Sequence, residues 1–150
     1  MFAPARDAFE WSRKTTPRRL RNATALWASY QRSKRSKNPR INGLPFSISF
    51  EPTTACNLRC PECPSGLRAF TRPTGNLKQD LFARVRDELG DDLWALTFYF
   101  RGEPYINPNF LAMVSLASKK GLYTNTSTNA HFLTEEKAEA IVRSGLSRLI

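Results

Sequence analysis

Strand-like and helix-like segments alternate through the last two thirds of the chain, and this alternation most constrains the fold. Short apolar or alternating runs predict strands at 46–52, 93–100, 122–128 and 146–150. Apolar residues at helical spacing predict helices within 77–90, 109–121 and 134–145. Strands that alternate with helices favour a parallel sheet with right-handed crossovers. The sequence therefore predicts an α/β fold.

Glycine stands at the end of each of these helices. Gly90, Gly121 and Gly145 lie where a helix pattern stops and a strand pattern begins, and glycine closes helices in the left-handed conformation. Thr134 is the expected N-cap of the last helix.

Three segments predict the core. The predicted buried faces of the first two helices are Leu77, Leu81, Phe82, Val85 and Leu89, then Phe110, Met113, Val114 and Ala117. The run 93–100, which contains Trp94, Phe98, Tyr99 and Phe100, predicts a strand buried on both faces.

The chain stops within the last predicted strand. A parallel strand there would leave an open sheet edge, so we expect these residues to be the first part of a longer protein. The longest apolar run, 93–100, is far shorter than the ~20 residues of a membrane helix, and we expect no membrane association.

Most of the positive charge lies in an N-terminal arm. Residues 1–40 hold eleven Lys and Arg against two Asp and Glu, whereas residues 41–150 hold twelve against eleven. A helix is expected at roughly 17–35, followed by a linker at 33–45. Its stripe of Leu20, Ala23, Trp27 and Tyr30 favours packing on the main domain, while the clustered cations leave a nucleic-acid or acidic partner open.

All three cysteines lie within eight residues. Cys56, Cys60 and Cys63 have the spacing C-x3-C-x2-C. An odd number of close thiols predicts metal binding in a reducing, cytoplasmic compartment rather than disulfides. Structural zinc sites and electron-transfer 4Fe–4S clusters take four protein ligands. Three thiols predict an open position, and the sole histidine, His131, is a weak alternative fourth ligand.

Three short motifs follow the first three predicted strands. They are the cysteine loop, "RGEP" (101–104) and "STNA" (127–130). Strand-to-helix loops converge at the carboxyl edge of parallel sheets, where α/β proteins keep their active sites. The three motifs therefore predict one site.

The sequence "CNLRCPEC" resembles the signature of the radical S-adenosylmethionine (SAM) enzymes. In that family three cysteines hold a 4Fe–4S cluster, and SAM chelates the fourth iron. Reductive cleavage of SAM then gives a deoxyadenosyl radical that abstracts a substrate hydrogen. The resemblance implies that Cys56, Cys60 and Cys63 bind the cluster.

"RGEP" and "STNA" resemble the SAM-binding motifs of the same family. The resemblance implies SAM contacts from Gly102, Glu103, Pro104, Ser127 and Asn129. Three residues depart from the family pattern: Arg101 and Ala130 where glycine is usual, and Glu62 where an apolar residue usually lies near adenine. Phe98 or Phe100 is the expected replacement for that adenine contact.

The resemblance covers roughly 44–150 and implies the first half of a (β/α)6 partial TIM-like barrel, preceded by an arm at 1–43. "EPTTACNLRCPEC" is especially similar to the branch with a C-terminal SPASM extension. That branch implies peptide or protein maturation, although a small-molecule substrate is left open. The implied reductant is a flavodoxin or ferredoxin, and no substrate-side catalytic residue is identified.

Two alternatives remain at this point. One is a radical SAM enzyme that acts on RNA through the basic arm. The other is a non-catalytic metal-binding module that contacts nucleic acid.

Overall fold

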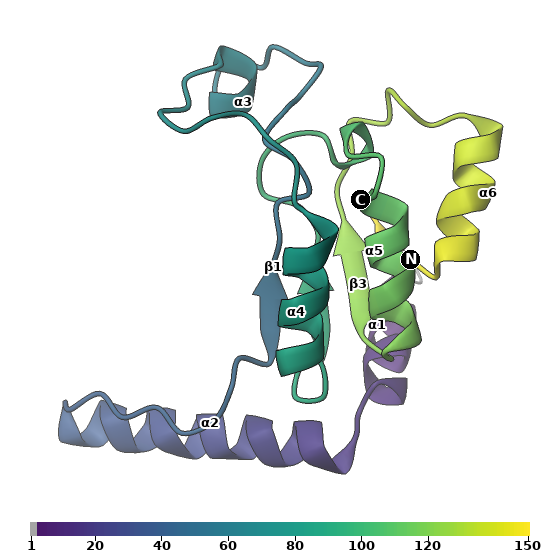
Figure 1. Ribbon diagram of the computed structural model, residues 1–150. Coiled ribbons are helices and arrows are strands. Elements are labelled where there is room, and N and C mark those ends of the chain that lie inside the picture. Colours follow the sequence, from purple (N-terminus) through teal and green to yellow (C-terminus); the bar gives the residue numbers. More distant parts are fainter. Residues whose placement is uncertain (1–2) are drawn as a thin grey trace.

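The computed structural model describes residues 3–150 and contains one sheet of four parallel strands (Figure 1). In chain order, and in the same spatial order, these are β1 (Ser47–Ser49), β2 (Ala95–Thr97), β3 (Tyr123–Thr126) and β4 (Arg148–Leu149). Ser47 pairs with Ala95, which pairs with Tyr123. The predicted α/β fold with parallel strands is confirmed, and each strand is shorter than its sequence pattern.

The three predicted helices connect these strands. They are α4 (Gln79–Leu89), α5 (Phe110–Lys119) and α6 (Glu135–Ser144). Two short elements that the sequence did not predict lie in the loops at the carboxyl edge: α3 (Pro64–Leu67) and η1 (Pro104–Ile106). In Figure 1, α4 and α5 lie in front of the sheet, and α3 projects above it.

The apolar core fills the space between these helices and one face of the sheet. Leu96 and Phe98 of the β2 segment pack with Phe82, Met113 and other apolar residues of α4, α5 and α6. Because side chains alternate across a strand, the other face carries the intervening polar residues: Ser49, Thr97 and Asn125, which lie in register. Ala95 and Tyr123 share that face and are buried, so the sheet has one apolar core face and one face of mixed polar and apolar residues.

Each helix ends within two residues of its predicted glycine, and the predicted left-handed conformation is correct at two of the three. Gly121 and Gly145 have φ angles of 73° and 75°, in the left-handed region. Thr134 caps α6 by accepting a hydrogen bond from the Lys137 backbone N–H. Gly90 has φ −60° and remains right-handed. A Cβ at Gly90 would stand 2.3 Å from the Arg86 carbonyl oxygen, so the close approach of this backbone oxygen accounts for the glycine.

The predicted core is confirmed for α5, whose four stripe residues are all buried. It is wrong at Leu81, which is 42% exposed, and at Tyr99 and Phe100, which are 39% and 71% exposed. The regular part of β2 ends at Thr97, so Tyr99 and Phe100 lie in the loop beyond the sheet rather than between its covering layers. Phe98 is fully buried as predicted.

The arm forms two helices, α1 (Ala3–Arg13) and α2 (Pro17–Ser36). The sequence predicted only the second. The prediction that the Trp27 stripe packs on the domain is wrong, because Leu20, Trp27 and Tyr30 are 52%, 66% and 61% exposed. The buried residues of α2 are instead Arg19, Asn22 and Ser29, and Arg19 is only 3% exposed.

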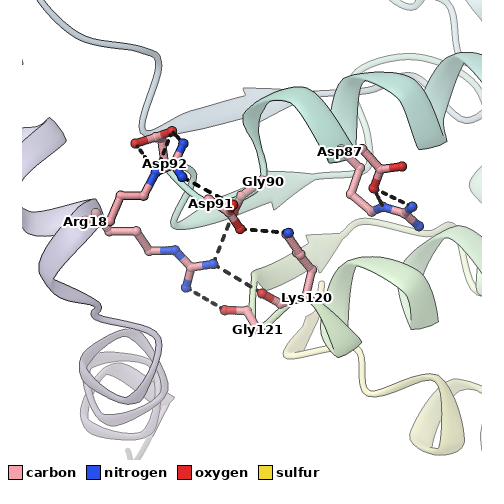
Figure 2. Close-up of polar contacts among 9 residues, drawn as sticks. Arg18, Asp87, Gly90, Asp91, Asp92, Lys120 and Gly121 are labelled. Atoms are coloured by element: carbon pink, nitrogen blue, oxygen red, sulfur yellow. Dashed lines mark hydrogen bonds and ion pairs between the residues drawn. The ribbon is translucent and has the colours of Figure 1, made fainter.

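Charged and polar contacts hold α2 to the body (Figure 2). Arg18 pairs with Asp92 at 2.7 Å and with Asp91 at 3.4 Å. The Arg19 guanidinium donates hydrogen bonds to the carbonyls of Gly121 at 2.8 Å and Gly90 at 3.2 Å. These carbonyls follow α5 and α4, so Arg19 satisfies acceptors at two helix ends. This is a stronger anchor than the apolar stripe that the sequence suggested.

Helix α1 lies against the starts of β3 and β4. Trp11 stacks on Tyr123 with ring centroids 5.3 Å apart. Asp7 accepts hydrogen bonds from the Tyr123 hydroxyl at 3.0 Å and from Arg148 at 2.7 Å. Within residues 3–150, no helix combines the length and apolar composition needed to cross a bilayer.

Candidate functional site

The structure brings the three predicted motifs together at the carboxyl edge of the sheet. The Glu103 backbone N–H donates to the Ala55 carbonyl at 2.8 Å, which joins "RGEP" to the start of the cysteine loop. The Asn129 side chain donates to Asn57 Oδ1 at 2.9 Å, which joins "STNA" to the same loop. Residues from three separate strand ends therefore form one cluster.

The cysteine loop holds three free thiols. Cys60 is exposed, whereas Cys56 and Cys63 are partly buried. Cys63 is the N-cap of α3. The backbone N–H groups of Gly66 and Ser65 hold the pKa of the Cys63 thiol below its usual value. Because the thiolate is the form that binds metals, this loop favours ligation at Cys63.

Gly66 keeps the loop compact. A Cβ at Gly66 would stand 2.5 Å from the Cys60 backbone nitrogen. Only a glycine therefore allows α3 to fold back against the backbone of the middle cysteine.

The thiols are not arranged as a formed metal site. Among residues 3–150, no three His, Cys, Asp or Glu side chains lie in an arrangement that could hold a metal ion. His131, the weak alternative ligand, is exposed, and its ring packs edge-on against Phe132.

Gly102 allows the second motif to touch the cysteine loop. Its φ is +75°, and a Cβ there would lie 2.1 Å from the Thr53 carbonyl oxygen. The Gly102 backbone N–H donates to Ser65 Oγ at 3.1 Å. The left-handed conformation and the close approach both require glycine, whereas Arg101 occupies the position before it without such a restriction.

Glu103 is buried, with 1% of its surface exposed. Oε1 accepts hydrogen bonds from the Thr128 hydroxyl at 2.8 Å and from the Tyr105 backbone N–H at 3.3 Å. Oε2 accepts one from the Asn129 backbone N–H at 2.9 Å. Its carboxylate is directed at the loop after β3, and Glu103 also lines a cavity together with Gly102 and Ser127. The SAM contact that the resemblance implies for Glu103 stays a prediction.

Ser127 and Asn129 lie beside a cavity of about 220 Å³. Cys56, Cys60 and Gly102 line the same cavity. The Asn129 side-chain amide also lies 4.0 Å from Cys56 Sγ. Pro104 is buried at the start of η1 and does not line this cavity.

Two contributors were missed from the sequence. Thr128 lies inside "STNA", yet only its neighbours were predicted as site residues. Tyr99 lines the 220 Å³ cavity, although it was predicted as core. Of the two residues expected near adenine, Phe100 lines the cavity, whereas Phe98 is fully buried in the core. The Arg101 guanidinium lies 5.2 Å over the Phe100 ring. Its place in the sequence could have identified Tyr99 as a site residue, because Tyr99 and Phe100 come directly before "RGEP" at the strand end.

The structure also shows the surroundings of Glu62 and Ala130, two of the residues that depart from the family pattern. Glu62 is exposed. Ala130 has φ +64°, in the left-handed region, which agrees with glycine being usual at this position. For an L-residue such as alanine this conformation costs roughly 1–2 kcal/mol.

The donor set fits a 4Fe–4S cluster with one open iron. Thiolates are the protein ligands of iron–sulfur clusters. Two of the three free thiols, Cys56 and Cys60, line a cavity that is also lined by Ser127 and Asn129, whose side chains offer the polar groups that an amino-acid moiety requires. The site therefore combines soft metal ligands with a pocket of mixed polar and apolar lining.

This fold and site define an α/β protein with a cofactor site at the carboxyl edge of its sheet. Residues 50–150 match the family model of the radical SAM superfamily. The chain belongs to this superfamily, whose members use a 4Fe–4S cluster and SAM, so the predicted family and cofactors are confirmed.

Known relatives include several peptide- and cofactor-modifying proteins. The PqqA peptide cyclase of Rhodopseudomonas palustris is 33% identical over 108 residues, which cover 71% of this chain and 28% of that protein. The tungsten-containing aldehyde ferredoxin oxidoreductase cofactor-modifying protein of Pyrococcus furiosus is 33% identical, with 66% and 28% covered. The AdoMet-dependent heme synthase of Methanosarcina barkeri is 30% identical, with 73% and 31% covered. The chain thus spans less than a third of these relatives.

A solved structure shares the fold. The crystal structure of BtrN in complex with AdoMet and 2-DOIA superposes with a TM-score of 0.64 at 24% identity. The match covers 73% of this chain and 46% of BtrN.

Proposed function

We propose that the full-length protein is a radical SAM enzyme. It cleaves SAM reductively at a 4Fe–4S cluster and uses the deoxyadenosyl radical to abstract hydrogen from a substrate. The observation that carries this proposal is the cavity shared by Cys56, Cys60, Gly102, Ser127 and Asn129. These two proposed iron ligands and three proposed SAM contacts line this one cavity in a chain of this superfamily, which supports the proposal.

The residues have distinct roles in the proposal. Cys56, Cys60 and Cys63 ligate three irons. Gly102 brings backbone close to the cysteine loop, and Pro104 stiffens the turn that follows. Ser127 and Asn129 face the amino-acid moiety or ribose of SAM. The arm at 1–43 is an accessory to the half barrel at 44–150.

Glu103 acts as a positioning residue in this proposal. Three hydrogen bonds engage its two carboxylate oxygens, and all three donors belong to its own turn or to the loop after β3. It holds Thr128 and Asn129 in place, which keeps that loop against the cavity. Because Glu103 also lines the cavity, the proposal keeps the SAM contact that the resemblance implies for it.

The proposed substrate is a peptide or protein. Support comes from the relatives named PqqA peptide cyclase, three of which are 33% identical to this chain. The proposed reductant is a flavodoxin or ferredoxin. The three free thiols support a reducing, cytoplasmic location.

The test is SAM cleavage by the full-length protein. The protein is reconstituted anaerobically with iron and sulfide, reduced, and mixed with SAM. The expected product is deoxyadenosine, detected by mass spectrometry, with none from a Cys60→Ala variant. Bound zinc with no deoxyadenosine from the wild type would overturn the proposal.

A further inference from the structure

The arm and the body enclose a large apolar groove far from the cysteine loop. Its volume is about 610 Å³. It lies between α1, α2 and the segments that precede β1 and β2, so it is at the opposite end of the sheet from the candidate SAM cavity (Figure 1). The principal lining side chains are Trp11, Leu26, Trp27, Tyr30, Phe46 and Trp94.

This groove gathers all three tryptophans of the chain. Trp27 and Tyr30 remain mostly in contact with water despite their size. Exposed aromatic side chains around a hollow are typical of protein interaction sites, where tryptophan and tyrosine contribute much of the binding free energy. The groove is therefore a candidate docking surface.

The charge of α2 identifies the kind of partner. This helix has six Lys and Arg and no Asp or Glu. Arg18 and Arg19 are used to hold the body. Within residues 3–150, Arg32 and Arg35 form no ion pair, and together with Trp27 they line a second hollow next to the groove. An apolar groove thus borders a cationic surface.

We propose that this surface docks an acidic, amphipathic segment of a partner protein. Apolar side chains of that segment enter the groove, and its carboxylates pair with Arg32 and Arg35. The charge complementarity is what selects an acidic partner, and the apolar walls select a polypeptide. Binding here does not depend on SAM cleavage, so the two proposals are tested separately.

Nucleic acid fits the groove less well than a polypeptide does. One face of Trp11 already stacks on Tyr123, so it is not available to a base. Nucleic-acid interfaces are polar and strongly cationic, whereas the groove walls are formed mainly by aromatic and aliphatic side chains. The cations lie along one side only, where carboxylates of a helix can reach them.

The test uses the full-length protein and a fluorescein-labelled 18-residue peptide. In this probe Leu and Trp recur at helical spacing among Glu residues, and a matched peptide carries Lys in place of every Glu. Fluorescence anisotropy is measured for the wild type, Trp27→Ala and the double variant Arg32→Glu/Arg35→Glu. Arg84→Glu, an exposed change on α4, is the control, and melting temperatures report folding.

The expected result is micromolar binding of the acidic peptide that weakens with added salt. Trp27→Ala and the double charge reversal each weaken it at least tenfold, and Arg84→Glu leaves it unchanged. Equal binding of the lysine peptide, no binding of the acidic one, or no effect of Trp27→Ala would overturn the proposal. A single-stranded RNA or an anionic phosphatidylserine vesicle that binds more tightly through the same residues would overturn the assignment to a polypeptide.

Discussion

The backbone N–H of Asn129 donates a hydrogen bond to Glu103 Oε2 at 2.9 Å. This contact joins the loop after β3 to the loop after β2. The Asn129 side chain continues the connection to Asn57 in the cysteine loop. Three loops that are far apart in sequence are therefore linked through one buried carboxylate.

Glu103→Gln should weaken this connection without changing the size of the side chain. The amide directs a donor at a group that is itself a donor, and a buried unmade hydrogen bond costs about 1–3 kcal/mol. We expect the free energy of unfolding to fall by that amount in urea titrations, and the affinity of the reconstituted protein for SAM to fall at least tenfold by calorimetry. Glu62→Gln, an exposed change in the cysteine loop, should leave stability unchanged. If Glu103→Gln kept the unfolding free energy and the SAM affinity of the wild type, this result would contradict the positioning role.

Gly102→Ala should be severe. The new Cβ would lie 2.1 Å from the Thr53 carbonyl oxygen at φ +75°. We expect a loss of unfolding free energy greater than about 1 kcal/mol and loss of SAM binding. The matched control is Gly75→Ala, because a Cβ at Gly75 meets nothing within 4 Å. Equal behaviour of the two variants in thermal unfolding would show that the close approach is not real.

Arg19→Met should detach the arm from the body. It removes the donors to the carbonyls of Gly90 and Gly121 and leaves both acceptors without these hydrogen bonds. The expected cost is about 2–4 kcal/mol of unfolding free energy. The exposed neighbour Arg21→Met is the control. Limited proteolysis should cut near residues 14–16 faster in Arg19→Met than in Arg21→Met, and equal rates would contradict the anchoring role.

The Arg18–Asp92 contact should make stability depend on pH in the acid range. The hydrogen bond from Arg18 holds the pKa of Asp92 below its ordinary value of 3.8. A carboxyl whose pKa is lowered by folding stabilises the folded state above its unfolded pKa, and that stabilisation is lost as the pH falls through its folded pKa. The stability difference between wild type and Asp92→Asn should be full above about pH 5 and shrink below about pH 4.

Urea unfolding from pH 3 to pH 7 measures this difference. Glu88→Gln, an exposed carboxyl on α4, controls for the change in net charge. A wild-type advantage over Asp92→Asn that stays constant down to pH 3 would show that Asp92 acts through packing rather than through its charge.

The local sequence pattern predicted the elements whose stability is local. The α5 stripe of Phe110, Met113, Val114 and Ala117 is buried as predicted because one helix face meets one sheet. The Thr134 cap was also predicted correctly, since its partner Lys137 is three residues away. Patterns of this kind need only the near neighbours in the chain.

Long-range contacts account for most of what was missed. The helical spacing of the Trp27 stripe predicted that this stripe is the packing face of α2. In the structure Arg19 instead anchors the helix by hydrogen bonds to the carbonyls of Gly90 and Gly121, which are about 70 and 100 residues away. The sequence likewise could not predict where the Glu103 carboxylate points, because its hydrogen-bond partners Thr128 and Asn129 follow a different strand. Sequence placed the motifs on one edge of the sheet but could not show that Glu103 would be buried and bonded to the loop after β3.

The most direct test of the central claim is the electron paramagnetic resonance spectrum of the reduced, reconstituted full-length protein with and without SAM. Three cysteine ligands leave one iron for the cofactor, so we expect a 4Fe–4S signal whose g-values shift when SAM is added. The signal should be lost in Cys56→Ala, Cys60→Ala and Cys63→Ala, together with the bound iron. A wild-type cluster whose spectrum does not respond to SAM would contradict the account.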